Sequence, residues 1–135
     1  MSKDSNKLVT LTRKEVLEVL ADTKDLRDRD IRKANLVKID FSNCDLRGTN
    51  FSYSNLKDCC FRNADLRGVS LWNANLEGAD FTNANLEDAD LDYAKLRGAI
   101  LLHANIRRAS LPTELIPRED ILASVDTGCR VGTKT

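Results

Sequence analysis

The stretch ANLEGADFTNANLEDAD, residues 74–90, decides the fold because it repeats one five-residue phrase with small changes. Large apolar residues recur at every fifth position, at Leu76, Phe81 and Leu86. Five residues advance an α-helix by about 500°, so these side chains would form no stripe on a helix. In a flat strand, an odd spacing places every second one on the opposite face. A chain that bends after each pentapeptide is the backbone that puts all of them inside.

The same repeat fills about two thirds of the chain. Stepping by five from Leu26 to Leu111 visits 18 positions, called the centres below, and none of them is polar. The centres are Leu26, Ile31, Leu36, Phe41, Leu46, Phe51, Leu56, Phe61, Leu66, Leu71, Leu76, Phe81, Leu86, Leu91, Leu96, Leu101, Ile106 and Leu111. Two residues before most centres stands a small side chain, usually Ala, and the residue between is mostly Asn or Asp. Self-similarity at a fixed period predicts an all-β solenoid with the centres inside.

A second period of twenty residues indicates how many pentapeptides make one turn of the solenoid. The triplet DLR recurs at 25–27, 45–47 and 65–67, and Phe recurs at 41, 61 and 81. Residues twenty apart therefore share one environment, one above another, which predicts a four-sided coil of four pentapeptides. Eighteen centres on four sides make about 4.5 coils, a rod roughly 20 Å tall at ~4.8 Å per coil.

A helix is predicted at each end of the rod, where a solenoid leaves backbone groups and apolar side chains uncovered. Thr12 and Glu15 form a T-x-x-E capping box, which predicts a helix over 13–22. Its expected apolar face is Val16, Leu17, Val19 and Leu20.

Pro112 breaks the repeat, and Pro117 begins a second predicted helix over 117–125. Its expected buried residues are Ile116, Ile121, Leu122 and Val125, and the tail after Val125 is expected to be disordered. The chain then divides into a tail and capping helix over 1–23, the repeat over 24–113, and a C-terminal helix and tail over 114–135.

The run A-[DN]-[LF]-x-x resembles the pentapeptide repeat family over about residues 24–113. Seven repeats fit the strict A-[DN]-[LIF] form, and they start at Ala34, Ala64, Ala74, Ala79, Ala84, Ala89 and Ala104. The resemblance implies a right-handed quadrilateral β-helix. The helix-then-repeat order is similar to stand-alone bacterial members. It is also similar to the domain that follows BTB/POZ in some channel-tetramerisation-type proteins.

The residues offer no constellation for catalysis, a cofactor or a metal. The single histidine, His103, points outward, about two coils from Cys60 on the same side. Cys59 and Cys60 are neighbours that point to opposite sides of the wall, so one metal cannot bind both. The glycines mark corners of the repeat rather than a phosphate-binding loop. The sequence therefore predicts a non-enzymatic protein with no cofactor.

The expected function is a protein–protein interaction scaffold whose partner is another protein. One alternative is a DNA-mimicking inhibitor or protector of a gyrase-type topoisomerase, a mechanism that needs an anionic rod. Residues 24–113 carry 14 Lys/Arg against 13 Asp/Glu, which disfavours both such a mimic and a nucleic-acid binder. A second alternative is substrate recognition in a BTB-type ubiquitin-ligase adaptor. That alternative rests on analogy, since the sequence contains no BTB domain.

Two surface features are candidate binding sites. The only Trp, Trp72, points outward, and Tyr53 and Tyr93 lie one coil to either side of it on the same wall, with Arg32 and Lys33 at its foot. These five residues form the predicted protein-binding patch.

The second feature is Ile100 and Leu102, which face outward in the last full coil. They are expected to be covered by the C-terminal helix or to form the seam of a weak homodimer. We expect no membrane segment, and the absence of a secretory signal and of a disulfide framework favours a cytoplasmic location.

Overall fold

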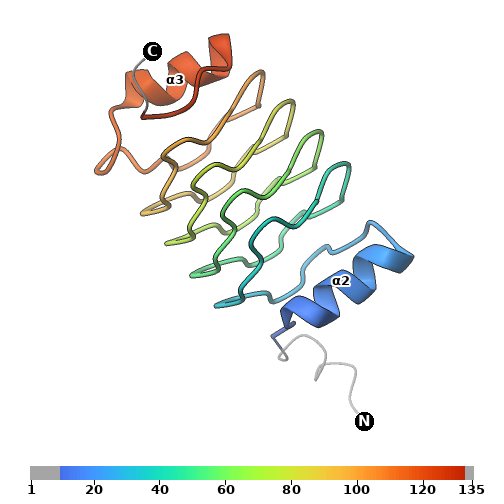
Figure 1. Ribbon diagram of the computed structural model, residues 1–135. Coiled ribbons are helices and arrows are strands. Elements are labelled where there is room, and N and C mark those ends of the chain that lie inside the picture. The colour runs from blue at the N-terminus through green and yellow to red at the C-terminus, as the bar shows by residue number, and fades with distance from the viewer. Residues whose placement is uncertain (1–9, 133–135) are drawn as a thin grey trace.

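The computed structural model describes residues 10–132 as a stack of coils with one helix at each end (Figure 1). Helix α2, Arg13–Asp22, lies across the first coil, and helix α3, Arg118–Thr127, lies at the opposite end of the stack. Residues 1–9 and 133–135 lie outside the described part of the chain.

The coils are joined by fourteen isolated parallel β-bridges, from Asp25–Asp45 to Asp90–Ser110, and each joins residues twenty apart. Each coil therefore contains four pentapeptides, as the period of twenty predicts. The bridges are made by the residue before each centre. At the first of them, Leu26 N–H donates to Asp45 O at 2.9 Å and Asp45 N–H donates to Lys24 O at 2.8 Å.

Centres twenty residues apart share a wall, and each wall is named below by one of its centres. The Leu46 wall holds Leu26, Leu46, Leu66, Leu86 and Ile106; the Leu71 wall holds Ile31, Phe51, Leu71, Leu91 and Leu111; the Leu76 wall holds Leu36, Leu56, Leu76 and Leu96; the Phe61 wall holds Phe41, Phe61, Phe81 and Leu101.

Each corner of the coil is a tight turn with one residue in the left-handed region. In the turn after Phe61, Ala64 N–H donates to Phe61 O at 3.0 Å. The residue two after the centre has a φ between 56° and 79° at all seventeen corners from residue 28 to residue 108. Gly occupies only four of these corners, although Gly adopts this conformation at the lowest cost.

The Asn or Asp that precedes most centres fixes the straight part of the wall. Its side-chain oxygen accepts the backbone N–H of the residue after the centre, as in Asp40 Oδ1 with Ser42 N at 2.9 Å. Asn75 and Glu77 form the same bond at 3.0 Å. Because Asn and Asp both supply this acceptor, the repeat accepts either residue at this position.

The interior is a set of side-chain columns. The Phe61 ring stacks on Phe41 at 5.2 Å and on Phe81 at 4.9 Å, with interplanar angles of 7° and 4°. This stacking confirms the predicted aromatic column, and the Phe51 ring packs edge-on against Phe61 at 6.4 Å. Every centre from Leu26 to Leu101 is buried. Ile106 and Leu111 are only partly buried, because no full coil lies beyond them.

The N-terminal helix matches its predicted bounds and its predicted cap. Glu15 N–H donates to Thr12 Oγ1 at 3.2 Å, and Thr12 N–H donates back to Glu15 Oε1 at 3.0 Å. Val16 is buried against the first coil, and Leu11 N–H donates to Asp30 O at 2.8 Å. The prediction that Leu17 belongs to the apolar face is wrong: its side chain is 44% exposed on the outer side of α2.

The C-terminal segment takes the place of a further coil. Within α3, Ile121 and Ser124 are buried, and the Ser124 hydroxyl accepts Leu101 N–H at 2.9 Å. The prediction that Leu122 is buried is wrong, since Leu122 is 39% exposed. Ser124 occupies the inward position instead, because a backbone donor at the end of the stack needs an acceptor there.

The expectation of a disordered tail after Val125 is wrong for residues 126–132. Val131 is buried, its N–H donates to Ala99 O at 2.8 Å, and its carbonyl accepts Gly98 N–H at 2.7 Å. The chain therefore returns to the rod after α3 and pairs with the last coil. Residues 133–135 of the expected tail lie outside the described part.

The outer side of the Leu46 wall carries a ladder of ion pairs. Arg27, Arg47 and Arg67 each bind the Asp two residues earlier, at 2.8, 2.7 and 2.6 Å. Two of these arginines also reach the Asp of the next coil, Arg27 to Asp45 at 3.5 Å and Arg47 to Asp65 at 3.6 Å. The hydrogen bond from Arg27 lowers the pKa of Asp25 to about 2, and Arg47 and Arg67 lower those of Asp45 and Asp65.

Replacing Phe61 by Ala removes the middle ring of the aromatic column. We expect this change to lower the free energy of unfolding by about 3–5 kcal/mol, because a buried ring leaves a cavity that the coils cannot close. Denaturant unfolding measures the loss. Arg62→Ala is the control, since it removes a neighbouring exposed side chain and should cost less than about 1 kcal/mol. Equal losses of unfolding free energy in the two variants would contradict the burial of Phe61 in the aromatic column.

Thr12→Ala removes the side-chain half of the capping box. We expect a loss of about 1 kcal/mol in unfolding free energy, while Thr12→Ser should retain most of it because Ser supplies the same acceptor. If the two variants unfold alike in urea, the cap contributes nothing to the stability of the rod.

The ion-pair ladder predicts a specific loss of stability in acid. The folded-state pKa values of Asp25, Asp45 and Asp65 are lowered, so their contribution is fully present above the unfolded value of about 3.9. It is lost as the pH falls from there toward about 2. Between these pH values the melting temperature should fall less steeply for the triple variant Asp25→Asn/Asp45→Asn/Asp65→Asn. Asn keeps the side-chain oxygen that accepts the backbone N–H of the following arginine. If the melting temperatures of the two proteins fall in parallel with pH, the ion-pair ladder has no role in acid stability.

Candidate functional site

The three predicted aromatic residues form one continuous surface feature, the aromatic ladder of Tyr53, Trp72 and Tyr93. The Trp72 ring lies 5.1 Å from that of Tyr53 and 5.9 Å from that of Tyr93, between ring centroids. The interplanar angles are 81° and 82°, so both contacts are edge-to-face. Such pairs contribute about 0.5–1.5 kcal/mol of stabilisation beyond that of their buried area. These contacts hold the three rings in fixed positions relative to one another.

The repeat explains why these rings meet. Trp72 directly follows its centre, and the two tyrosines each stand two residues after theirs, at the left-handed corners one coil on either side. Tyr53 N–H donates to Trp72 O at 3.0 Å, which fixes the register between the first two rings. The tyrosines are 50% and 47% exposed, whereas Trp72 is half-buried because a tyrosine covers it from each side.

The tyrosines occupy corners that suit their residue type poorly. Tyr53 has a φ of 62° and Tyr93 a φ of 61°, in a region that Gly, Asn and Asp tolerate best. A bulky side chain there costs roughly 1–2 kcal/mol. The same corner of the coil between them holds Asn73, which shows that the rod itself does not require an aromatic residue.

The polar groups of the three aromatic side chains make no hydrogen bonds within residues 10–132. Among the hydrogen bonds of residues 10–132, none involves the Trp72 indole N–H or the hydroxyls of Tyr53 and Tyr93. Arg32 and Lys33, the two basic residues at the foot of the predicted patch, differ in whether their charge is paired. Arg32 donates to both carboxylate oxygens of Asp30 at 2.8 Å, so its charge is compensated. Lys33 is exposed at a left-handed corner one coil before Tyr53, with its N–H bonded to Ser52 O at 3.1 Å.

The second predicted surface, Ile100 and Leu102, lies beside the C-terminal segment. Both side chains are half-buried. The α-carbon of Gly128 lies so close to Leu102 that an added Cβ would come within 3.3 Å of the Leu102 side chain. His103 N–H donates to Val125 O at 2.9 Å. The C-terminal segment thus covers Leu102 within one chain, and the homodimer seam stays a prediction.

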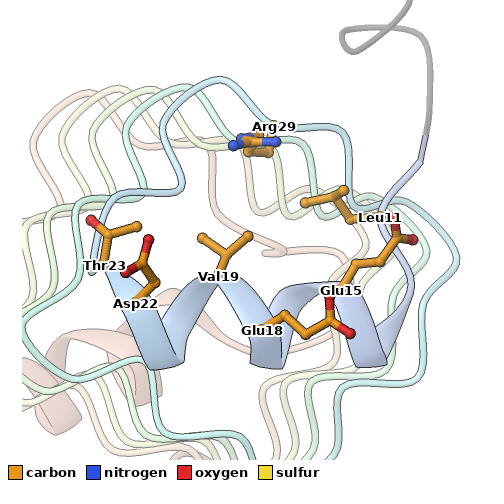
Figure 2. A pocket seen from close by; sticks show the side chains of 7 residues that line it. All are labelled: Leu11, Glu15, Glu18, Val19, Asp22, Thr23 and Arg29. Atoms are coloured by element: carbon orange, nitrogen blue, oxygen red, sulfur yellow. The ribbon is translucent and has the colours of Figure 1, made fainter.

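A cleft of about 480 Å³ opens at the N-terminal end, where α2 crosses the first coil without filling it (Figure 2). Figure 2 shows Val19 pointing from α2 toward the opening and Arg29 across from it. Glu15, Glu18 and Asp22 line the helix side. Glu15 is engaged by Thr12, whose hydrogen bonds lower the pKa of its carboxyl group. The cleft thus contains charged groups but no His or Cys.

Among residues 10–132, no hydrogen bond joins His103 to a cysteine. Burial raises the pKa of Cys59 to about 12 and also raises that of Cys44, so neither is a nucleophile at neutral pH. His103 is exposed, and within residues 10–132 no three His, Cys, Asp or Glu side chains are grouped to hold a metal ion. No helix in this part of the chain is long and apolar enough to span a bilayer.

The solved structures similar to this chain include two proteins from the cyanobacterium Nostoc sp. strain PCC 7120. HetL, a pentapeptide repeat protein involved in heterocyst differentiation regulation, is 35% identical with a TM-score of 0.67, over 76% of this chain and 45% of HetL. The pentapeptide repeat protein alr5209 is 32% identical with a TM-score of 0.52, over 71% of each chain. This chain thus spans less than half of HetL.

No curated protein sequence gives a significant match. The family description "Pentapeptide repeat region" matches residues 25–111, which are the residues whose bridges and corners build the coils. The chain belongs to the pentapeptide repeat family.

Proposed function

We propose that this protein is a non-enzymatic protein-binding scaffold and that the aromatic ladder is its binding surface. The observation that carries the proposal is the contact of three surface rings whose polar groups have no partner among residues 10–132. Tyr and Trp are enriched at protein interfaces because they bury large area at low entropic cost.

The rod suits a scaffold because its outer surface is independent of its core. Outward side chains are carried by a backbone held by bridges every five residues, so they are preorganised for binding. We also propose that the coil is right-handed, the hand that connections between parallel strands almost always take. A cytoplasmic location stays a prediction, supported by four free cysteines.

The alternatives have less support. A DNA mimic needs an anionic surface, whereas Asp25, Asp45 and Asp65 on the Leu46 wall are each neutralised by an arginine. The ubiquitin-ligase adaptor rests on the analogy of helix and repeat alone. We propose another protein as the partner of the scaffold, and a monomer or a weak homodimer through the C-terminal end as its oligomeric state.

Trp72→Ala tests the proposal in a pull-down from the native lysate. We expect the variant to keep the melting temperature within a few degrees, since its side chain lies outside the core, and to retain at most about a tenth of the captured partner. Tyr53→Asn/Tyr93→Asn is a second variant that places a favourable residue at both corners, so it should fold at least as well and still lose the partner.

Arg62→Ala, on the exposed side of the opposite Phe61 wall, is the matched control and should capture the partner as the wild type does. If every protein captured by the wild type is also captured by both ladder variants, the ladder is not the binding surface.

A further inference from the structure

We propose that the aromatic ladder binds a cationic side chain, an arginine or lysine in a basic segment of the partner, between the rings and the carboxylates of Asp90 and Asp92. This inference rests on the proposed function and names the chemistry of the partner. It follows from where these two carboxylates lie relative to Trp72 and from how they are paired.

The backbone places Asp90 and Asp92 beside the indole. Leu71 N–H donates to Asp90 O at 2.7 Å, and Asn73 N–H donates to Asp92 O at 3.0 Å. The two acidic residues therefore bracket Trp72 one coil further along the Leu71 wall, next to Tyr93. Asp92 occupies the same place in its pentapeptide as Trp72 does, so both side chains point outward in one column.

Neither carboxylate has a cationic partner within residues 10–132. Asp90 Oδ1 accepts the N–H of Asp92 at 3.0 Å, and Asp92 accepts the hydroxyl of Ser110. These bonds orient the two groups and leave both charges uncompensated. By contrast, Asp30 at the foot of the same wall is paired with Arg32 at 2.8 Å. The ladder thus combines three rings with two negative charges at its Tyr93 end.

This combination selects a cation. The face of a Trp or Tyr ring attracts Arg and Lys, and a carboxylate beside the ring completes the recognition of a guanidinium group. The long aliphatic stem of Arg or Lys lies along apolar surface while its charged end reaches the carboxylates. A neutral segment gains neither contact, and an acidic segment is in addition repelled by Asp90 and Asp92.

Lys33 does not cancel this preference. It belongs to the coil of Ile31, three coils before Asp92, which is roughly 14 Å at ~4.8 Å per coil. That separation exceeds the screening length of about 8 Å at physiological ionic strength. The Leu71 wall itself is therefore acidic beside Tyr93 and basic only at its foot. Lys95, two residues after Tyr93, is exposed on the adjoining Leu76 wall.

The test uses the fluorescence of Trp72, the only tryptophan, as the reporter. A Gly/Ser peptide carrying spaced arginines should change the Trp72 emission and saturate, and a peptide with Glu at the same positions should not. Asp90→Asn/Asp92→Asn should weaken binding of the arginine peptide at least about fivefold, as should raising NaCl from about 50 to about 500 mM. Equal binding of the arginine peptide by the wild type and this double variant would overturn the proposal.

Asn at these positions keeps the rod intact. Asn75 accepts the neighbouring N–H just as Asp90 does, so the Asp90→Asn change preserves this bond. Asp40→Asn is the matched control: Asp40 makes the same bond to Ser42 on the opposite Phe61 wall. This control variant should bind the arginine peptide as the wild type does, and weakening equal to that of the double variant would also overturn the proposal.

The pull-down separates this inference from the proposed function. A partner lost with Asp90→Asn/Asp92→Asn and with Trp72→Ala supports both. A partner lost only with Trp72→Ala leaves the scaffold in place and overturns the cationic partner. A partner that both variants retain overturns the two proposals together.

Discussion

The hydrogen bond from the N–H of each centre between Leu26 and Leu91 to the carbonyl of the next coil is the interaction on which the whole structure depends. It runs from Leu26 to Asp45 at 2.9 Å and recurs at successive centres along all four walls. Because the donor is the centre itself, the same residue that turns its side chain inward also fixes the spacing to its neighbour. Columns such as the stacked rings of Phe41, Phe61 and Phe81 follow from that one register.

Much of the fold could be predicted from the sequence, because solenoid repeats carry their three-dimensional period in the chain. The centres give the inner surface, the echo at twenty residues gives the four sides, and the capping box gives α2 at its observed bounds. The C-terminal end could not be predicted as well. Which residue of α3 faces inward depends on the donor at Leu101, and the return of Val131 depends on Gly98 and Ala99. These are single contacts with no periodic signal.

The candidate site was predictable in position and not in its interactions. Register alone brought Tyr53, Trp72 and Tyr93 to one wall, but their edge-to-face contacts depend on side-chain rotamers. The same limit applies to Arg32 of the predicted patch, whose ion pair with Asp30 also depends on its rotamer. Asp90 and Asp92 look like ordinary repeat residues in the sequence. Only the pattern of ion pairs separates them from the neutralised acids elsewhere on the rod.

The segments that cap the two ends of the rod also block the pairing of further chains onto its end coils. A stack of parallel coils offers at each end the same ladder of donors and acceptors that lets amyloid fibrils add chain after chain. Here Arg13 of α2 donates to the carbonyl of Val37 at 2.9 Å, and Val125 and Val131 accept the amides of His103 and Gly98 at the other end. Templated growth would first have to displace these segments. A repeat that is open-ended by geometry is therefore kept finite by the few residues that do not repeat.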